Sequence, residues 1–395
     1  MNQTFSNAFM NTYHRLPVVF TKGSGARLTD REGKSYLDFT SGIAVNCLGH
    51  NHPALVEAIS GQAARLIHTS NYFLSDTSLA FAERLVQACR KVGMERVFLS
   101  NSGAEANEGA IKIARKYSQT KYGNCRHRIV SLKGSFHGRT LATLTATGQD
   151  RFHPDCFAPF VEGFLYVEPN DLAAMDKALD GTVAAVLMEP VQGESGIRPL
   201  DPIYVREVAR LCTERDVLLM FDEVQSGMGR TGTFLASEHY GVPVDVVTLA
   251  KGLAGGVPVG AVLAGKKAAD VLGVGDHGST FGGNPLAAAA GLAVLNLVDT
   301  PDMLADISRK GERIMETVRR WQHPAIRDVR GRGLMIGIDI STDAWPVLEK
   351  ALSRGLLLLS AGQKTLRLLP PYIIKDEEIE RGLAILKTVL DEVIR

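Results

Sequence analysis

The chain has 395 residues, of which 45% are hydrophobic and 22% are charged, and its formal net charge is +1. This length favours about two structural units with a core that needs no disulfide or metal to stabilise it. The balance of 44 basic and 43 acidic residues gives no reason to expect nucleic acid or an anionic membrane as a partner.

Cysteine usage and apolar windows indicate the compartment. The five cysteines are an odd number without a CxxC pair, which fits a reducing cytoplasm better than a secreted disulfide scaffold. The initial MNQTFSNAFM lacks the basic and apolar regions of a signal peptide. The longest apolar windows are interrupted by Lys251, Pro258 or the pair Asn284-Pro285, so none predicts a membrane span. We therefore expect a cytoplasmic protein.

The predicted elements begin with hairpin-like alternation in ARLTDREGKSYLDFTSG, within the first fifty residues. Apolar runs then predict strands at 96–100, 128–132, 183–190, 217–223, 244–250 and 258–265. Helix-like stretches lie among them, at 104–117 and 204–215. Strands that are apolar on both faces and separated by helices favour a mostly parallel sheet covered on both sides. The predicted fold class is therefore α/β, with ligands expected at the carboxyl ends of the strands.

The character of the sequence changes after the helix-like NPLAAAAGLAVLNLV. Amphipathic helices then mix with short strands at 334–340, 356–360 and 365–370, which indicates a smaller α+β unit. The first fifty residues are expected to pack beside it. We predict a large α/β domain at 51–287 and a small α+β domain formed by 1–50 and 288–395.

Lys251 is the single charge in the stretch VTLAKGLAGGVPVGA, directly after a predicted buried strand. Glycine-rich turns are commonly exposed, so a surface lysine is one interpretation. The other is a Schiff-base lysine, because a desolvated amine has a lowered pKa and becomes nucleophilic at neutral pH. Only other residues of a cofactor site, elsewhere in the chain, can decide between these two interpretations of Lys251.

Candidate partners follow other predicted strands. Asp222 and Glu223 end an apolar run, where a carboxylate could meet a cationic ring nitrogen or could simply cap a helix. In SNSGAEANEGA, the small residues Gly103 and Ala104 at a helix start leave backbone N–H groups open to a phosphate. Ser102 with Glu105 also matches a capping box, and both interpretations can hold together.

The stretch GSFHGRT adds an aromatic and a cation. Phe136 could stack on a flat ring, although alone it would be read as a core residue, and Arg139 could clamp a carboxylate. A buried lysine, an acid after a strand, an anion-binding helix start and an aromatic together indicate a pyridoxal 5′-phosphate site.

Other motif matches are weak. GVGDHG matches GxGxxG but follows no strand, so a dinucleotide site is disfavoured. GAVLAGKK resembles a P-loop but has Lys267 where Ser or Thr should bind magnesium. His50 and His52 have no evident third ligand, so we expect no metal site.

The chain resembles the class III (ω-amino acid) pyridoxal phosphate aminotransferases over nearly its whole length. The motifs that carry the resemblance occur in family order: LDFTSGIAVNCLGHNHP, HTSN, NSGAEANE, SFHGRT, EPVQGESG, FDEVQSGMGRTG, LAKGLAGGVPVGA, GSTFGGNPLA and LRLLPP. Each is weak alone, whereas nine in order are very specific. The resemblance implies fold type I, with a large domain around the sheet and a small domain from both chain ends.

The resemblance also implies roles in cofactor binding. Lys251 would carry pyridoxal phosphate and move the substrate proton, Asp222 would pair with the pyridine nitrogen, and Gln225 would lie near the phenolic oxygen. Gly103 and Ala104 would hold the phosphate. The further cofactor contacts that it implies are Ser102, Phe136 stacked on the ring, Glu223, Val224 and Thr280. Because Thr280 would reach the phosphate of the neighbouring subunit, the implied active unit is a homodimer.

The implied substrates are N2-acetylornithine as amino donor and 2-oxoglutarate as acceptor, in a step of arginine biosynthesis. Arg139 would clamp the donor α-carboxylate, and Arg367 would be a second clamp that Glu194 masks until 2-oxoglutarate displaces it. Ser279 would face the substrate. The sequence departs from the family pattern at Ser195, where glycine is common, and at Asn51, which is a variable position. Neither residue has an implied catalytic role.

Three alternatives stay open at this point. A sister enzyme could use succinylornithine, ornithine, acetyl-lysine or 4-aminobutyrate as donor. A non-enzymatic binding protein with the same fold should have lost Lys251, Asp222 or an arginine clamp, and all are present. A nicotinamide oxidoreductase is disfavoured because its glycine fingerprint is misplaced.

Overall fold

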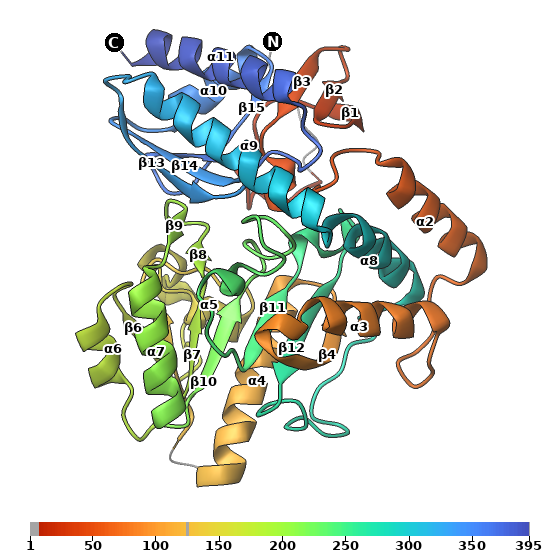
Figure 1. The fold of residues 1–395 in the computed structure, drawn as a ribbon, viewed down its shortest axis with the longest axis vertical. Coiled ribbons are helices and arrows are strands. Elements are labelled where there is room, and N and C mark those ends of the chain that lie inside the picture. Colours follow the sequence, from red (N-terminus) through yellow and green to blue (C-terminus); the bar gives the residue numbers. More distant parts are fainter. Residues whose placement is uncertain (1–7, 124–125, 395) are drawn as a thin grey trace.

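The computed structural model describes residues 8–123 and 126–394. Cys125 and the first seven residues of the N-terminal stretch considered above therefore lie outside the described residues. Three larger sheets, a two-stranded hairpin and the helices around them build this part of the chain (Figure 1).

The main sheet runs in the order β4-β12-β11-β10-β7-β5-β6. Its strands are β4 (Met94–Ser100), β12 (Gly260–Gly265), β11 (Val246–Leu249), β10 (Leu218–Asp222), β7 (Val183–Met188), β5 (Arg128–Leu132) and β6 (Phe164–Val167). β12 pairs antiparallel with both β11 and β4, and the other pairings are parallel. The predicted mostly parallel sheet is therefore confirmed, with β12 as its reversed strand.

Both faces of the main sheet are buried. On β10, Leu218 and Met220 join one apolar cluster, whereas Leu219 and Phe221 join another. Successive residues of a strand point to opposite faces, so these clusters cover the two sides of the sheet. Helix α4 (Gly103–Tyr122) supplies the first cluster and α7 (Pro202–Glu214) contributes to the second. This explains why the strands read as continuous apolar runs.

The two chain ends share the remaining sheets. β1 (Phe20–Ser24), β2 (Arg27–Asp30) and β3 (Ser35–Asp38) form one sheet with β15 (Leu356–Leu357), which runs parallel to β3. A second sheet has the order β13 (Ile326–Arg332), β14 (Met335–Ile340), β17 (Thr365–Leu368) and β16 (Leu359–Ser360). Figure 1 shows β1, β2 and β3 at the same end of the molecule as α11 (Asp376–Val393). The domain division at 51–287 stays a prediction, and α8 (Pro285–Val298) crosses its second boundary.

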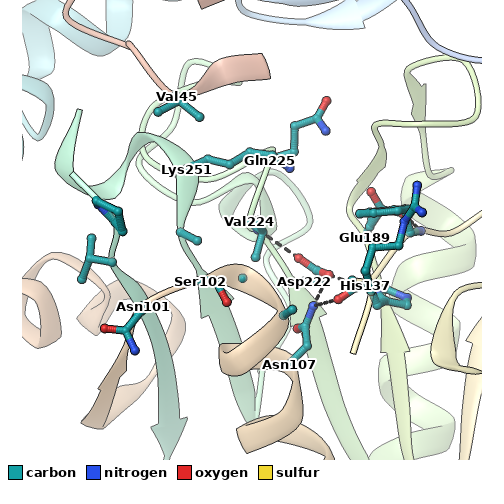
Figure 2. A pocket seen from close by; sticks show the side chains of 18 of the residues that line it. Val45, Asn101, Ser102, Asn107, His137, Glu189, Asp222, Val224, Gln225 and Lys251 are labelled. Carbon is teal, nitrogen blue, oxygen red and sulfur yellow. Dashed lines mark hydrogen bonds and ion pairs between the residues drawn. The ribbon is translucent and has the colours of Figure 1, made fainter. Parts of the chain in front are cut away.

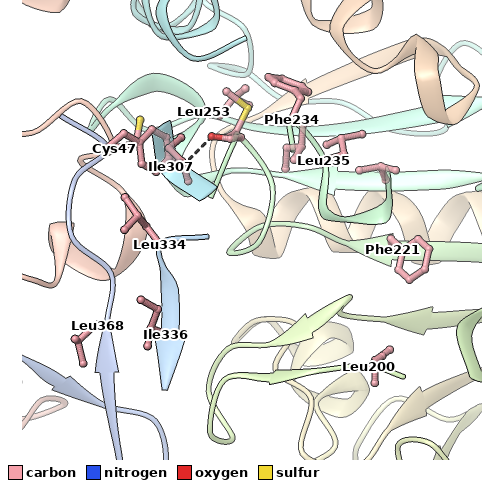
Figure 3. Close-up of a cluster of buried hydrophobic side chains, with 14 of the residues drawn as sticks. Cys47, Leu200, Phe221, Phe234, Leu235, Leu253, Ile307, Leu334, Ile336 and Leu368 are labelled. Atoms are coloured by element: carbon pink, nitrogen blue, oxygen red, sulfur yellow. Dashed lines mark hydrogen bonds between the residues drawn. The ribbon is translucent and has the colours of Figure 1, made fainter. Parts of the chain in front are cut away.

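Helices complete the layers. They are α2 (Pro53–Arg65), α3 (Asp76–Ala88), α5 (Leu141–Ala146), α6 (Leu172–Ala178), α9 (Pro301–Arg320), α10 (Trp345–Ser353) and α11 (Asp376–Val393). A short hairpin, β8 (Val191–Gln192) with β9 (Arg198–Pro199), follows β7. One apolar cluster includes Phe221 of the main sheet and Leu334, Ile336 and Leu368 of the second sheet, so the core continues between them (Figure 3).

The element α1 (Ser41–Ala44) is a left-handed turn. All four of its residues have positive φ, including 66° at the β-branched Ile43. Such backbone costs about 1–2 kcal/mol per non-glycine residue. Asp38 holds the turn, because its Oδ1 accepts bonds from Thr40 N at 2.8 Å and from Ser41 N at 3.0 Å. The turn brings the next residue, Val45, to the wall of the main cavity.

Candidate active site

A cavity of about 410 Å³ opens at the carboxyl ends of β4, β7, β10 and β11 (Figure 2). Many residues predicted from the sequence line it. They are Ser102, Gly103, Ala104, Phe136, Arg139, Asp222, Val224, Gln225 and Lys251. Segments far apart in the sequence therefore meet where an α/β fold is expected to bind its ligand.

Lys251 follows β11 at the point where the strand ends. Its φ of 45° is in the left-handed region, which is strained for a residue with a side chain. In the view of Figure 2, its side chain lies between Val45 and Asp222. Burial lowers the pKa of the Lys251 amine, although the charges of Glu194 and Asp222 oppose this shift. A neutral amine, the nucleophilic form, is thus favoured by the desolvated position.

Asp222 ends β10 and is 3% exposed. Its Oδ2 accepts bonds from His137 Nδ1 at 2.8 Å and from Asn107 Nδ2 at 2.7 Å. Its Oδ1 accepts a bond from Val224 N at 3.0 Å, while Thr248 Oγ1 holds Asn107 in place at 2.8 Å. Donors on both oxygens fix the orientation of this carboxylate and provide the environment that an ionised acid needs.

The start of α4 forms an anion cradle. The Ser102 side chain accepts a bond from Glu105 N at 3.2 Å, so the predicted cap is present. The N–H groups of Gly103 and Ala104 belong to the first turn and have no partner within the helix. A Cβ on Gly103 would lie 2.7 Å from Cγ1 of Val224, so only glycine allows this close approach. Cap and anion site are therefore compatible.

Phe136 and Arg139 form the cavity mouth. The Phe136 ring is half-buried and meets the ring of Phe152 edge-on, with centroids 5.6 Å apart. The Arg139 guanidinium lies over both rings, 5.5 Å from the Phe136 centroid and 4.2 Å from that of Phe152. Arg139 is exposed, so its charge is available to a ligand that enters from solvent.

Arg367 is the interior arginine. It lies on β17, is 3% exposed, and its Nη1 donates to Glu194 Oε1 at 2.5 Å. Gln225 completes the group, because its Nε2 donates to the same Glu194 oxygen at 3.3 Å while its Oε1 accepts from Arg367 at 3.3 Å. Burial opposes the ionisation of Glu194, but the charge of Arg367 outweighs it and holds the pKa of Glu194 below its usual value. Two oppositely charged groups thus neutralise one another directly behind Gln225, a residue of the cavity lining.

Five predicted residues are not among those that line the cavity: Glu194, Arg367, Ser279, Thr280 and Glu223. Ser279 touches its edge, because Asn101 Nδ2 donates to Ser279 Oγ at 3.0 Å. Thr280 is exposed in the following loop. The carboxylate of Glu223 points away, since its oxygens accept bonds from Ala236 N at 2.5 Å and Ser237 N at 2.8 Å. A direct contact between the Glu223 carboxylate and a ligand in this cavity is therefore not what the geometry provides.

The lining residues that escaped the sequence analysis include Val45, Asn107, His137 and Glu189. His137 is adjacent to Phe136, and Asn107 lies four residues after Gly103 on the same helix face. The spacing of both residues could therefore have predicted that they lie near the site. Glu189 directly follows β7, the same position that singled out Asp222. Burial raises the pKa of Glu189 to about 7; His137 opposes this shift and the Asp222 charge adds to it.

Motifs dismissed from the sequence have structural partners. His50 Nε2 lies 2.8 Å from Asp38 Oδ2, and Asp276 of GVGDHG pairs with Lys116 on α4. Within residues 8–123 and 126–394, no group of His, Cys, Asp and Glu side chains is arranged to hold a metal ion. In that part of the chain, no helix is both long and apolar enough to span a bilayer. The cytoplasmic location stays a prediction.

A family model described as "Aminotransferase class-III" matches residues 8–390. The chain belongs to the class-III aminotransferases. An acetylornithine aminotransferase of Caldanaerobacter subterraneus is 49% identical over 387 residues, which cover 97% of each chain. Among solved structures, N-acetylornithine aminotransferase from Stenotrophomonas maltophilia is 41% identical, with a TM-score of 0.84 and coverage of 97% of this chain and 98% of that one.

A sister enzyme is also similar in structure. Ornithine aminotransferase from Toxoplasma gondii is 34% identical, with a TM-score of 0.92 and coverage of 98% of this chain and 93% of that one. Another structure of that enzyme reveals partial occupancy of pyridoxal phosphate at its active site. The aminotransferase family fixes the fold as type I and the cofactor as pyridoxal 5′-phosphate, and both expectations are confirmed.

The residues of this aminotransferase fit that cofactor. The cradle at Gly103 offers unpaired N–H groups to a phosphate, and the Asp222 carboxylate matches a protonated ring nitrogen. Lys251 and Phe136 line the same cavity, where they would supply an amine and a flat apolar face. When bound, pyridoxal phosphate supplies an aldehyde that links to amines and a ring that takes up electrons from the substrate carbon. The cavity therefore has the donor set that this chemistry requires.

Proposed function

We propose that the enzyme transfers the side-chain amino group of N2-acetyl-L-ornithine to 2-oxoglutarate. The products are N-acetyl-L-glutamate 5-semialdehyde and L-glutamate, as in arginine biosynthesis. The observation that carries the proposal is the unequal state of two arginines. Arg367 is buried and neutralised by Glu194, whereas Arg139 is exposed at the mouth. The relative at 49% identity that is named acetylornithine aminotransferase supports the same donor.

The two arginines suit a donor whose α-amine is acylated. Only its side-chain amine can react, so its α-carboxylate is at the far end of the molecule, where Arg139 can grip it bidentately. With Arg367 neutralised, no inner positive charge draws that carboxylate toward the reacting carbon. The acceptor is a dicarboxylate. Its 1-carboxylate would take Arg367 from Glu194 while its 5-carboxylate takes Arg139, so one site serves both partners in turn.

Other residues orient and move protons. Asp222 would hold a proton on the ring nitrogen of the cofactor, and Gln225 would lie near its phenolic oxygen. The Lys251 amine would hold the cofactor and would carry a proton to and from the substrate carbon. Thr280, Ser279 and Ser102 complete the proposed contacts, Thr280 acting on the phosphate of the neighbouring subunit.

We also propose the homodimer. The loop around Thr280 is bordered by exposed apolar side chains, with Tyr72 94%, Leu74 86% and Phe281 61% exposed. Asn71 ties these segments together, because its Nδ2 donates to the carbonyl of Ser279 at 2.8 Å. A contiguous apolar surface beside a predicted subunit contact supports burial against a second copy. Sedimentation of the holoenzyme should give a dimer or a multiple of one, and a fully active monomer would contradict this proposal.

A donor panel with 2-oxoglutarate as acceptor tests the substrate. N2-acetylornithine should have the highest kcat/KM, with 4-aminobutyrate far lower. Arg139→Ala should weaken both half-reactions by roughly tenfold or more, because hydrogen bonds to charged groups contribute about 1.5–3 kcal/mol. The sister alternative is ornithine, which the likeness to the T. gondii enzyme supports. Free ornithine or 4-aminobutyrate outperforming acetylornithine would overturn the donor and leave the aminotransferase family in place.

A further inference from the structure

Glu189 binds two separate segments of the cavity wall at once. It is 5% exposed and directly follows β7. Its Oε1 accepts a bond from Phe136 N at 2.9 Å, and its Oε2 accepts one from Gly193 N at 3.0 Å. Figure 2 shows Glu189 close to His137. Each carboxylate oxygen therefore accepts a bond from a different backbone segment.

The two segments carry different parts of the site. Phe136 belongs to the segment that follows β5 and forms one wall of the cofactor cavity. Gly193 belongs to the turn after β8 and immediately precedes Glu194, the partner of Arg367. These segments are 57 positions apart in the chain, and the Glu189 carboxylate connects them directly.

The Gly193 peptide extends this connection to Arg367. Its N–H donates to Glu189, and its carbonyl accepts a bond from Arg367 Nη1 at 3.2 Å. A Cβ at Gly193 would lie 2.5 Å from Cδ of Gln225, so the peptide is also confined from its other side. A continuous series of hydrogen bonds therefore runs from Phe136 N through Glu189 and Gly193 to Arg367, and such series strengthen cooperatively.

We propose that Glu189 is a positioning residue that couples the aromatic segment at Phe136 to the Glu194–Arg367 pair. With the Gly193 peptide anchored, Glu194 is kept on Arg367, and the interior arginine stays masked while a side-chain amine donor is bound. This inference rests on the proposed function for its effect on donor choice. Its structural part, the coupling of two backbone segments, does not depend on which donor the enzyme uses.

The chain offers a matched control in Glu223. It is also a buried carboxylate after a strand of the main sheet, and its two oxygens likewise accept two backbone N–H bonds, from Ala236 and Ser237. Those partners do not line the cavity. Glu223→Gln therefore reproduces the loss of a buried charge and of a backbone acceptor without touching the Phe136 and Gly193 segments.

The test is residue-resolved amide hydrogen exchange on the full-length protein, with and without bound cofactor. Glu189→Gln should speed exchange at both Phe136 N and Gly193 N by roughly tenfold, because an amide can accept at only one of the two sites and more weakly. Glu223→Gln should speed exchange at 236–237 and leave those two amides unchanged. Unchanged exchange in Glu189→Gln, a change at one amide only, or an equal change in Glu223→Gln would each overturn the coupling.

Two further measurements keep the test decisive. If Glu189→Gln does not fold, Glu189→Asp retains the charge but is too short to reach both segments, and should speed exchange at one amide at least. In the holoenzyme, Glu189→Gln should raise kcat/KM for glutamate relative to N2-acetylornithine by a few fold. Faster exchange with an unchanged ratio would overturn the role in donor choice. If the donor panel favours another ω-amine, the proposed function falls, whereas the exchange result still decides the coupling.

Discussion

Replacement of Glu194 by glutamine separates the charge of the mask from its shape. In the parent enzyme, Arg367 Nη1 donates to Glu194 Oε1 at 2.5 Å. Glutamine keeps an oxygen that can accept this bond but removes the negative charge. Arg367 would then carry an uncompensated charge beside Gln225 of the cavity lining. A donor that presents its α-carboxylate there, such as glutamate, should be helped relative to N2-acetylornithine.

The magnitude follows from the kind of hydrogen bond lost. Bonds to charged groups contribute about 1.5–3 kcal/mol, and neutral ones about 1 kcal/mol. The pair is buried on the Arg367 side and 23% exposed at the Glu194 side chain, so screening by water is incomplete. A difference of about 1–2 kcal/mol is expected, which corresponds to a factor of roughly 5–30 in the ratio of the two donors.

The assay is the first half-reaction alone. The enzyme is mixed with each donor in the absence of 2-oxoglutarate, and kcat/KM is obtained from the change in cofactor absorbance. Glu392→Gln is a suitable control, because it removes a carboxylate paired with Arg354 on the surface, far from the cavity lining. A glutamate-to-acetylornithine ratio that is the same in Glu194→Gln as in the parent enzyme would refute the masking argument.

Three further predictions concern the buried charges. Lys251→Ala should retain pyridoxal phosphate without covalent attachment and lose turnover, as absorbance and steady-state assays will show; turnover near that of the parent would remove Lys251 from the mechanism. Asp222→Asn keeps the shape but not the charge beside the ring nitrogen, so kcat should fall strongly while the cofactor still binds, and an unchanged kcat would contradict this role. Burial raises the pKa of Glu223 to about 7 from an ordinary value of 4.5, so the folded state holds a proton that the unfolded state releases, and unfolding free energy should fall as pH rises from about 4.5 to 7. Glu223→Gln should make that slope shallower in urea titrations, and an identical slope would exclude Glu223 as its source.

The sequence was sufficient for the fold and for much of the cavity. Continuous apolar runs such as 183–190 and 244–250 became β7 and β11 because both faces of the main sheet are covered. Asp222 and Lys251 were identifiable because each is a charge directly after such a run. The Glu223 carboxylate is bonded to Ala236 N and Ser237 N, because adjacent residues of an extended chain point to opposite faces, and its cofactor contact stays a prediction.

Other features depend on contacts that no local pattern records. Nothing between Ser41 and Ala44 except Gly42 favours a left-handed turn, and it exists because Asp38 binds the backbone on its N-terminal side. His137 contacts Asp222 because the segment after β5 passes over the end of β10. Asn107 fixes this segment, since its Nδ2 donates to the carbonyl of His137 at 2.8 Å. These positions follow from tertiary packing rather than from propensity.

Arg367 lies where the second sheet meets the main sheet. The residue proposed to set donor preference is therefore carried by a different sheet from the residues proposed to carry out aminotransfer. Asp222 ends β10 of the main sheet and Lys251 follows β11 of that sheet, whereas Arg367 is carried by β17 of the second sheet. Arg230 joins the two, because its Nη1 donates to the carbonyl of Pro370 at 2.7 Å, and Tyr372 returns a bond from its hydroxyl to the carbonyl of Met228 at 2.8 Å. The distance between Arg367 and the reacting amine is therefore set by how the sheets dock. A small change at this junction would move Arg367, the proposed carboxylate clamp, while the residues proposed to hold the cofactor stay fixed, so we expect donor preference to change without loss of aminotransfer.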